Sequence, residues 1–387
     1  MNSLLSDVSK VQNQMAQWRH EIHKHPETAF EEVKTAAYVA SLLESWGYAV
    51  VTGIGKTGIV ASLKAGEGEK IIGLRADMDA LPVTEAVESE YKSRNAGKMH
   101  ACGHDGHTAM LLGAAKYLAE KKNFSGTVRL IFQPAEETIS GASAMIADGL
   151  LERFPMDAIF GMHNMPGLPV GRFAIRTGPF FASTDEFRIR ITGRGGHAAW
   201  PNQAIDPIVI GAQLVQAIQT IASRNADPVS ALVVSVTQFH AGTAHNVIPE
   251  EAEVSGTVRA LSPENRALGE ARIKALAENI AAAHGATAEV NWRRGYPVMV
   301  NHSAEADICA QFAAEVAGAN AVDAEAEPLM GGEDFAYMTQ ARPGALILIG
   351  NGETAGLHHP AYDFNDEIIP LGISYWTALA EGNGKAA

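Results

Sequence analysis

Short apolar runs with abrupt polar ends are the feature that most constrains how this chain folds. Four runs are almost entirely apolar, at residues 71–74, 128–132, 158–161 and 345–349. Runs of this length without alternation are typical of strands buried on both faces, as in the middle of a parallel sheet. Helical patterns at 110–118 and 142–151 separate the first three runs. This order predicts an α/β fold with a mixed, mostly parallel sheet flanked by helices.

The segment before the first of these runs predicts two helices and a hairpin. Apolar residues recur at helical spacing between residues 15 and 48, with a break at Pro26. The glycine-rich stretch 53–58 then matches the spacing of a dinucleotide-binding loop, but a strand pattern at 59–64 follows it. A dinucleotide loop needs a helix there, because the helix N-terminus holds the pyrophosphate. We therefore interpret the stretch as a hairpin or loop.

The hydrophobic pattern changes near Thr184, where Phe187, Ile189 and Ile191 alternate with charged residues. The patterns that follow predict a helix, two strands, a helix and a strand, at 208–222, 231–239, 252–258, 265–284 and 288–292. The order β-α-β-β-α-β is that of a ferredoxin-like α+β domain. We expect a discontinuous main domain at 1–181 and 297–387, and an inserted domain at 182–296.

The composition excludes several classes of partner. The 387 residues carry 30 Lys and Arg against 44 Asp and Glu, a formal charge of -14, so we expect neither nucleic acid nor membrane as a partner. Residues 1–10 lack an export signal, and no stretch approaches the roughly 18 uninterrupted apolar residues of a membrane span. With two cysteines only, Cys102 and Cys309, we expect a cytoplasmic location.

Polar clusters at the ends of the apolar runs carry the chemistry. They are the segments 75–79, 100–107, Glu136 with Glu137, His163, and His358 with His359. Ligands bind outside the carboxyl ends of parallel strands, so we expect these clusters to converge. Each cluster alone has an ordinary structural explanation. Together, thiol, imidazole and carboxylate form a ligand set for first-row metals, with too many ligands for one tetrahedral ion. We therefore expect two ions.

The local spacing assigns roles within these clusters. Cys102 and His104 project to the same side if the backbone between them is extended, so we place both in the loop before the 110–118 helix. The thiolate of Cys102 has lone pairs enough to bridge two ions. In an extended segment Glu136 and Glu137 would point opposite ways, so one can ligate while the other serves as a general base.

These residues together resemble the dinuclear metal-dependent amidohydrolases and peptidases that include hippurate hydrolases, indole-acetyl-amino-acid hydrolases and N-acetyl-diaminopimelate deacetylases. Aminoacylases and carboxypeptidases are more distant relatives. The likeness covers nearly the whole chain. It rests on RHEIHKHPETAFEE (19–32), RADMDALP (75–82), HACGHDGH (100–107), FQPAEE (132–137), GMHNMP (161–166), GGHAAWP (195–201), GTAHNVIP (242–249), GTVR (256–259), GEDF (332–335) and LHHP (357–360).

The resemblance implies a role for each matching residue of the main domain. Its metal ligands are Cys102 as the bridge, His104, Glu137, His163 and His358. Glu136 becomes the general base, and Asp79 the carboxylate behind the ligands. At the position of Asp77, distant relatives have a histidine that ligates the metal. In this chain His104 is expected to be the ligand instead. His358 is preferred to His359 because the family's ligand follows the leucine directly. The cofactors are two divalent ions per chain, Zn or Mn, with Co or Ni as alternatives.

The resemblance also implies that the inserted domain is a lid and a dimerisation domain, and that the protein is a homodimer or homotetramer. His197 is expected to stabilise the tetrahedral oxyanion, commonly across the dimer. Asn246 and Arg259 are expected to bind the substrate, Arg259 through its carboxylate. The chain departs from the family pattern at three positions that put the identity of the substrate in doubt: Trp200, Asn202 and Gly332.

The expected function is a metal-dependent hydrolase that cleaves the amide bond of an N-acyl amino acid, such as a hippurate-like or N-acetyl substrate. Metal-activated water attacks the carbonyl, and Glu136 is the general base. A dipeptidase or carboxypeptidase of the same chemistry is one alternative. A non-catalytic, metal-dependent small-molecule binding protein is another, but such a protein needs the ligands and not the additional base.

Overall fold

The chain folds into two compact units in the computed structural model. The structure describes residues 5, 8, 10–138 and 140–383, so the expectation about residues 1–10 falls largely outside the described residues. The first unit comprises Met1–Gly178, Val300–Glu327 and Asp334–Ala387, and the second comprises Pro179–Met299 and Pro328–Glu333. Strands β7 (Gly178–Phe181) and β14 (Met299–Asn301) lie where the chain passes between them.

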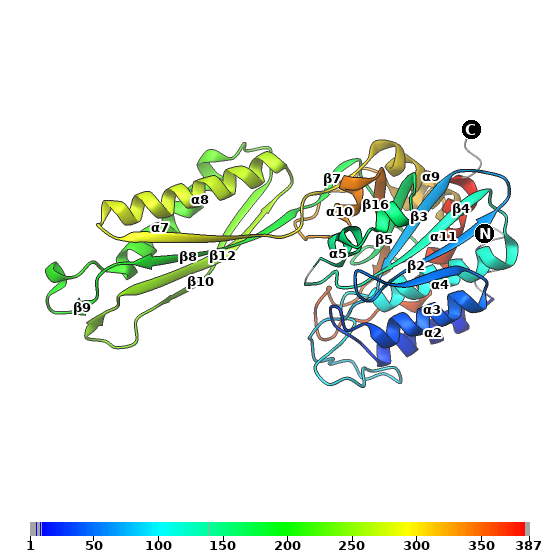
Figure 1. The fold of residues 1–387 in the computed structure, drawn as a ribbon, viewed down its shortest axis with the longest axis horizontal. Coiled ribbons are helices and arrows are strands. Elements are labelled where there is room, and N and C mark those ends of the chain that lie inside the picture. The colour runs from blue at the N-terminus through cyan, green and yellow to red at the C-terminus, as the bar shows by residue number, and fades with distance from the viewer. Residues whose placement is uncertain (1–4, 6–7, 9, 139, 384–387) are drawn as a thin grey trace. The chain divides into compact units, whose positions relative to one another are not determined.

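An eight-stranded sheet forms the centre of the first unit (Figure 1). Its order is β1 (Ala49–Ile54), β2 (Gly58–Ala65), β4 (Gly126–Gln133), β3 (Ile71–Asp77), β5 (Ala158–Pro166), β16 (Gly344–Gly352), β6 (Phe173–Ala174) and β15 (Val322–Asp323). The four predicted apolar runs are the four adjacent strands β4, β3, β5 and β16, and they pair in parallel. Strands β1, β2 and β6 pair antiparallel to their neighbours towards the centre of the sheet. The predicted mixed, mostly parallel sheet is confirmed.

Helices flank this sheet. They are α2 (Gln12–Lys24), α3 (Val33–Ser45), α4 (His104–Lys121), α5 (Gly141–Ala147), α6 (Leu150–Arg153), α9 (Ser303–Ala317), α10 (Ala336–Ala341) and α11 (Ile369–Asn383). Helix α4 contacts β3, α2 and α11. The single helix predicted at 142–151 is divided into α5 and α6, because Gly149 adopts a left-handed φ of 85° between them.

The glycine-rich stretch 53–58 is a hairpin connection, as predicted. Strands β1 and β2 pair antiparallel on either side of it, and Lys56 at its tip has a φ of 81°. The strand β2 that follows supplies no helix N-terminus for a pyrophosphate.

The second unit has the predicted β-α-β-β-α-β order, in β8 (Ser183–Thr192), α7 (Pro207–Thr220), β10 (Leu232–Ala241), β12 (Glu251–Ala260), α8 (Pro263–Ala283) and β13 (Thr287–Arg294). Its four strands form an antiparallel sheet in the order β10-β12-β8-β13. Helix α7 begins where the Asp206 carboxylate accepts from the backbone N–H of Ile208, and α8 where Ser262 accepts from Asn265. The short strands β9 (Gly196–His197) and β11 (Val247–Ile248) pair with each other.

None of the helices in the described part of the chain is long and apolar enough to cross a membrane.

A buried ionic network ties helix α2 to the start of α4. Arg19 Nη1 lies 3.0 Å from Asp105 Oδ2, and both side chains are fully buried. His23 Nδ1 lies 2.8 Å from the same carboxylate oxygen, and His23 Nε2 lies 3.2 Å from Glu85 Oε1. Burial opposes charge on His23, but the carboxylates of Asp105 and Glu85 outweigh it and raise the pKa of His23 to about 9.

This network predicts a loss of stability at alkaline pH. The pKa of His23 is higher in the folded state than its unfolded value of about 6.5, so its stabilising contribution is complete below that value and disappears as the pH rises through about 9. We expect the free energy of unfolding of the wild type, relative to that of His23→Gln, to fall by up to about 3 kcal/mol between pH 6 and pH 10. Urea titrations at a series of pH values measure it. An unchanged difference would show that His23 is neutral in the folded protein.

Candidate metal centre

The polar clusters of the first unit converge at the carboxyl ends of its central strands. Asp77 ends β3 and Asp79 follows it, while Glu136 and Glu137 come three and four residues after the end of β4. The remaining predicted site residues of this unit come from the segment before α4, the first residue of α4, strand β5 and the loop after β16: Cys102, His104, His163 and His358. All the predicted ligands therefore reach one region of the first unit.

The five predicted ligands form a connected group. Cys102, Glu137 and His358 each offer an atom within 4.8 Å of the others, and Glu136, Glu137 and His104 do the same. Glu137 Oε1 lies 3.2 Å from His358 Nε2 and 3.8 Å from His104 Nε2. Cys102 Sγ lies 3.5 Å from His163 Nε2. Glu137 thus joins the two groups, as a shared centre requires.

The hydrogen bonds of two histidines leave Nε2 of each ring directed at this group. His104 Nδ1 lies 3.2 Å from Asp79 Oδ1, and His163 Nδ1 lies 2.6 Å from the backbone oxygen of Asn164. Carboxylate and carbonyl oxygens only accept, so both Nδ1 atoms carry the proton. Asp79 also accepts from the backbone N–H of Glu137 at 3.0 Å. Asp79 therefore holds two predicted ligands, which is how partners behind a metal site orient its ligands.

The electrostatics of the group fit a divalent cation. Burial, and then the carboxylates of Glu137 and Glu136, raise the pKa of the Cys102 thiol well above its usual range. Burial opposes charge on His104, but Asp77 and Asp79 raise its pKa to about 10, so a metal ion would displace a proton there. Within the described chain, His104 Nε2 is buried without a hydrogen-bond partner. A soft thiol, imidazoles and carboxylates suit a first-row divalent metal.

The two glutamates differ from the expectation in their geometry. They lie in a turn and not in an extended segment, because Ala135 before them has a left-handed φ of 52°. The buried Glu32 carboxylate accepts from the backbone N–H of Ala135 at 2.9 Å and holds this turn. Both glutamates offer an oxygen within 4.8 Å of the same His104 nitrogen, so the expectation that they point opposite ways is wrong.

The loop before α4 also differs from the expectation. Gly103 has a φ of 86°, so the backbone between Cys102 and His104 is left-handed and not extended. His104 is the first residue of α4, whereas it was expected in the loop. With this left-handed turn at Gly103, Cys102 and His104 both come within 4.8 Å of Glu137.

The buried residues Asp77 and His107 form a potential metal-binding group with His104 and His163. The sequence did not predict this group. His107 Nδ1 lies 2.6 Å from Asp77 Oδ1, and its Nε2 accepts from the backbone N–H of Asn164 at 2.9 Å. The other oxygen of Asp77 lies 2.8 Å from Arg75 Nη1. These contacts occupy both nitrogens of His107. The spacing of His107, three residues after His104 in one helix, was the available signal.

Of the two adjacent histidines in the last cluster, the structure brings His358 to Glu137. His358 has a left-handed φ of 66°, and its backbone N–H donates to Ala101 at 2.8 Å. Both histidines are exposed, but His359 joins no potential metal-binding group among the described residues, and its Nδ1 accepts from the backbone N–H of Ala361 at 3.0 Å. This geometry supports the preference for His358 as a ligand.

The other predicted site residues lie in the second unit. His197 is exposed in β9, and its Nδ1 accepts from the backbone N–H of Ala199 at 3.1 Å, so the proton of the neutral ring is on Nε2. The Trp200 ring lies 4.6 Å from the His197 ring. Asn246 is exposed beside β11, and Arg259 is half-buried in β12.

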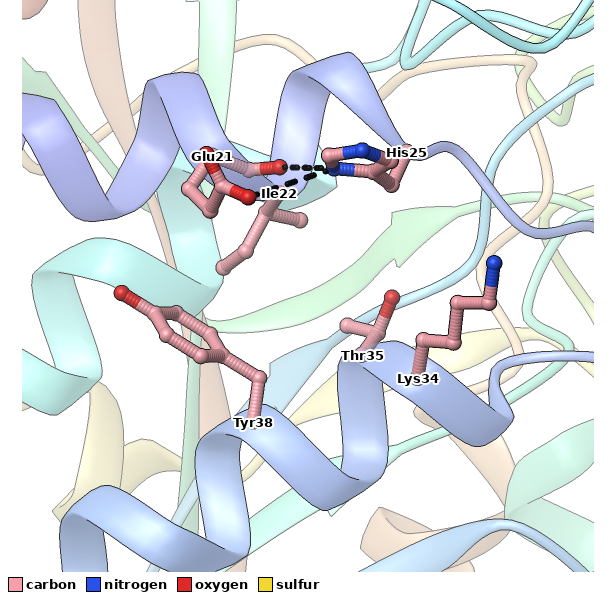
Figure 2. A pocket seen from close by; sticks show the side chains of 6 residues that line it. All are labelled: Glu21, Ile22, His25, Lys34, Thr35 and Tyr38. Carbon is pink, nitrogen blue, oxygen red and sulfur yellow. Dashed lines mark hydrogen bonds and ion pairs between the residues drawn. The ribbon is translucent and has the colours of Figure 1, made fainter.

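A small pocket elsewhere in the first unit is distinct from this centre. Figure 2 shows it between α2 and α3, lined by Glu21, Ile22, His25, Lys34, Thr35 and Tyr38. His25 Nδ1 donates to the backbone oxygen of Glu21 at 3.0 Å across one edge. None of the predicted ligands lines this pocket.

The chain is similar to proteins of known family along its whole length. It is 43% identical over 378 residues to a hippurate hydrolase of Campylobacter jejuni, covering 98% of both chains. It is 41% identical over 364 residues to an N-acetylcysteine deacetylase of Bacillus subtilis, covering 94% of both. A solved structure of a dinuclear metal-binding peptidase of the M20 family, from B. subtilis, superposes with a TM-score of 0.86 at 35% identity. It covers 98% of this chain and 100% of that one.

The sheet, the inserted α+β fold and the cluster of thiol, imidazole and carboxylate define a class of metal-dependent hydrolases. The model of Peptidase family M20/M25/M40 matches residues 73–382, and this chain belongs to that family. It is a hydrolase that acts on carbon–nitrogen bonds, as the resemblance implied.

The geometry predicts that Cys102 is required for metal content. Elemental analysis of protein purified without chelator should give about two divalent ions per chain. Cys102→Ala should lose most of both, because the bridging thiolate that the resemblance implies would support each ion. Cys309→Ala is the matched control, since Cys309 is also buried and free but lies in α9. Undiminished metal content in Cys102→Ala would contradict a bridging thiolate.

Proposed function

We propose that the protein hydrolyses the amide bond of an N-acyl amino acid, with Glu136 as the general base. The observation that carries this proposal is the Glu136 carboxylate, an additional buried acid within 4.8 Å of atoms of His104 and Glu137. A protein that only bound a ligand through metals would need the five ligands and not this sixth group. The names of the two relatives, a hippurate hydrolase and an N-acetylcysteine deacetylase, support the substrate class.

The metal site is proposed to consist of Cys102, His104, Glu137, His163 and His358. When bound there, two divalent ions, Zn or Mn with Co or Ni as alternatives, would lower the pKa of water and polarise a carbonyl. Glu136 accepts the proton of the attacking water and returns it to the leaving amine. The products are a carboxylic acid and a free amino acid. Glu136 ends the reaction in its starting protonation state, because it gives the amine the proton that it took from water.

The second unit is proposed to supply the remaining contacts to the substrate. His197 Nε2–H is a donor suited to the oxyanion of the tetrahedral species, because its Nδ1 is occupied by the Ala199 N–H. Arg259 offers a planar pair of donors to the carboxylate of the amino acid, and Asn246 offers an amide. The exposed ring of Trp200 lies beside His197 and would also contact the substrate.

We propose that the second unit also makes a homodimer, or a homotetramer, and that His197 acts across it. Strand β10 is an edge of its sheet. Two of its residues, Val233 and Phe239, are exposed by 40% and 37%, and Ile208 and Val209 at the start of α7 by 40% and 56%. An unpaired edge beside apolar side chains is a surface on which a second copy can pair and bury area.

A dipeptidase or carboxypeptidase of the same chemistry remains the second candidate. The solved relative from B. subtilis is described as a peptidase, and the catalytic groups would be identical for an N-acyl and a peptide amide. Rates on hippurate, N-acetyl amino acids, N-acetyl-diaminopimelate and dipeptides, each with Zn, Mn, Co and Ni, separate the two.

Because both cysteines are buried and form no disulfide, we propose the reducing cytoplasm as the compartment.

Replacing Glu136 tests the proposed base. Glu136→Gln should keep its metal and its fold but lose turnover by about 10²–10⁴-fold, since the amide has nearly the same size and cannot accept the proton. Glu137→Gln is the matched variant, and it should lose metal. Steady-state rates and elemental analysis of both variants decide. If Glu137→Gln keeps its metal and loses turnover, the two roles are exchanged.

Replacing His197 tests the proposed oxyanion donor. His197→Ala should lower kcat by about 10²–10³-fold while metal content is unchanged, because one donor to the oxyanion is removed. If the residue acts across the dimer, mixing His197→Ala with Glu136→Gln under subunit exchange should restore part of the activity. One site of each mixed dimer would then hold both intact residues. A fully active His197→Ala would remove the residue from the mechanism.

A further inference from the structure

Asn164 is fully buried next to His163, and all of its polar atoms are occupied. Its side-chain Nδ2 donates to the backbone oxygen of Cys102 at 2.7 Å. Its backbone oxygen accepts from His163 Nδ1 at 2.6 Å. A single residue thus touches the backbone of one predicted ligand and the ring of another, which come from segments 61 residues apart.

His107 and Tyr362 hold Asn164 in this position. The backbone N–H of Asn164 donates to His107 Nε2 at 2.9 Å, and Nδ2 lies 3.0 Å from the same nitrogen. His107 Nδ1 lies 2.6 Å from Asp77, so the ring carries its proton on Nδ1 and accepts on Nε2. The hydroxyl of the buried Tyr362 donates to Asn164 Oδ1 at 2.8 Å.

The turn before α4 is shaped to admit this arrangement. A Cβ atom on Gly103 would lie 2.4 Å from Asn164 Nδ2 and 2.4 Å from the Tyr362 hydroxyl, closer than real Cβ contacts allow. Only a residue without a side chain leaves room for both groups, and the φ of 86° at Gly103 favours glycine for a second reason. The close packing of Asn164 and Tyr362 against the Cys102 loop is therefore a specific feature of the fold.

We propose that Asn164 is a positioning residue that fixes Cys102 and His163 relative to each other, with Tyr362 and His107 holding its amide, and thereby sets the affinity for metal. This inference rests on the proposed metal site. Asn164 itself has no atom left to ligate, so it acts only through its neighbours. Partners behind metal ligands typically change metal affinity by about 10–100-fold when they are replaced.

The test measures metal affinity and stability separately in three variants. Tyr362→Phe removes only the hydroxyl that holds the Asn164 amide, and Asn164→Ala removes the amide itself. Tyr48→Phe is the matched control, because the Tyr48 hydroxyl is also buried and donates to a backbone oxygen, that of Ala115, at 2.9 Å. Zn²⁺ affinity is measured by competition with a chromophoric chelator, and the thermal midpoint of each metal-free variant is recorded.

We expect Tyr362→Phe to bind Zn²⁺ about 10-fold more weakly than the wild type, and Asn164→Ala up to about 100-fold more weakly. Tyr48→Phe should lose comparable stability and keep wild-type affinity. With Co²⁺, the thiolate-to-cobalt charge-transfer absorption should weaken in Tyr362→Phe and stay unchanged in Tyr48→Phe, because only the first loosens the loop of Cys102.

The outcomes separate this inference from the metal centre itself. Wild-type affinity in Tyr362→Phe overturns the positioning role and leaves the metal centre intact. An equal loss of affinity in Tyr362→Phe and Tyr48→Phe also overturns it, because general destabilisation then explains both. A wild-type protein that binds no metal overturns the proposed centre and this inference together. If Asn164→Ala does not fold, Tyr362→Phe alone decides.

Discussion

The first turn of helix α4 depends on partners for its buried ionisable side chains. His104, Asp105 and His107 are within four residues of each other, and all three are buried. Removing an ionisable group from water costs several kcal/mol unless a partner compensates it. Each side chain therefore needs a partner from another element, and finds it at 3.2 Å or less, in Asp79, Arg19 and Asp77 respectively. This requirement fixes α4 against α2 on one side and the end of β3 on the other.

The placement of the proposed metal ligands follows from that helix. Its N-terminus stands at the carboxyl edge of the sheet, where β3, β4 and β5 deliver Asp79, Glu137 and His163. Cys102 arrives through the left-handed turn at Gly103, against which Asn164 packs. Proposed ligands from four separate segments thereby meet in groups whose atoms lie within 4.8 Å of one another or in hydrogen-bonding contact. Rigid strands and a buried helix start hold such a constellation better than free loops could.

The two units divide the proposed chemistry between them. The first holds every predicted metal ligand and the proposed base, whereas the second holds His197, Asn246 and Arg259. The second unit has its own core of apolar side chains between the sheet and helices α7 and α8. Its edge strand β10 is the surface that we propose for a second copy. In the proposed function, the first unit would activate water and the second would recognise the substrate.

The sequence by itself determined the elements and the chemistry. Apolar runs located the four central strands, and periodicity predicted the β-α-β-β-α-β order of the second unit. The motifs supplied the proposed ligands, which the structure brings together. The tertiary structure alone decided how side chains point. Whether Glu136 and Glu137 diverge depends on φ of Ala135, which is set by Glu32, 103 residues away. Likewise, the contacts of Asn164 join segments whose proximity no local pattern records. Hydrophobic periodicity is a property of neighbours in the chain, whereas the direction of a loop side chain depends on partners that only folding supplies.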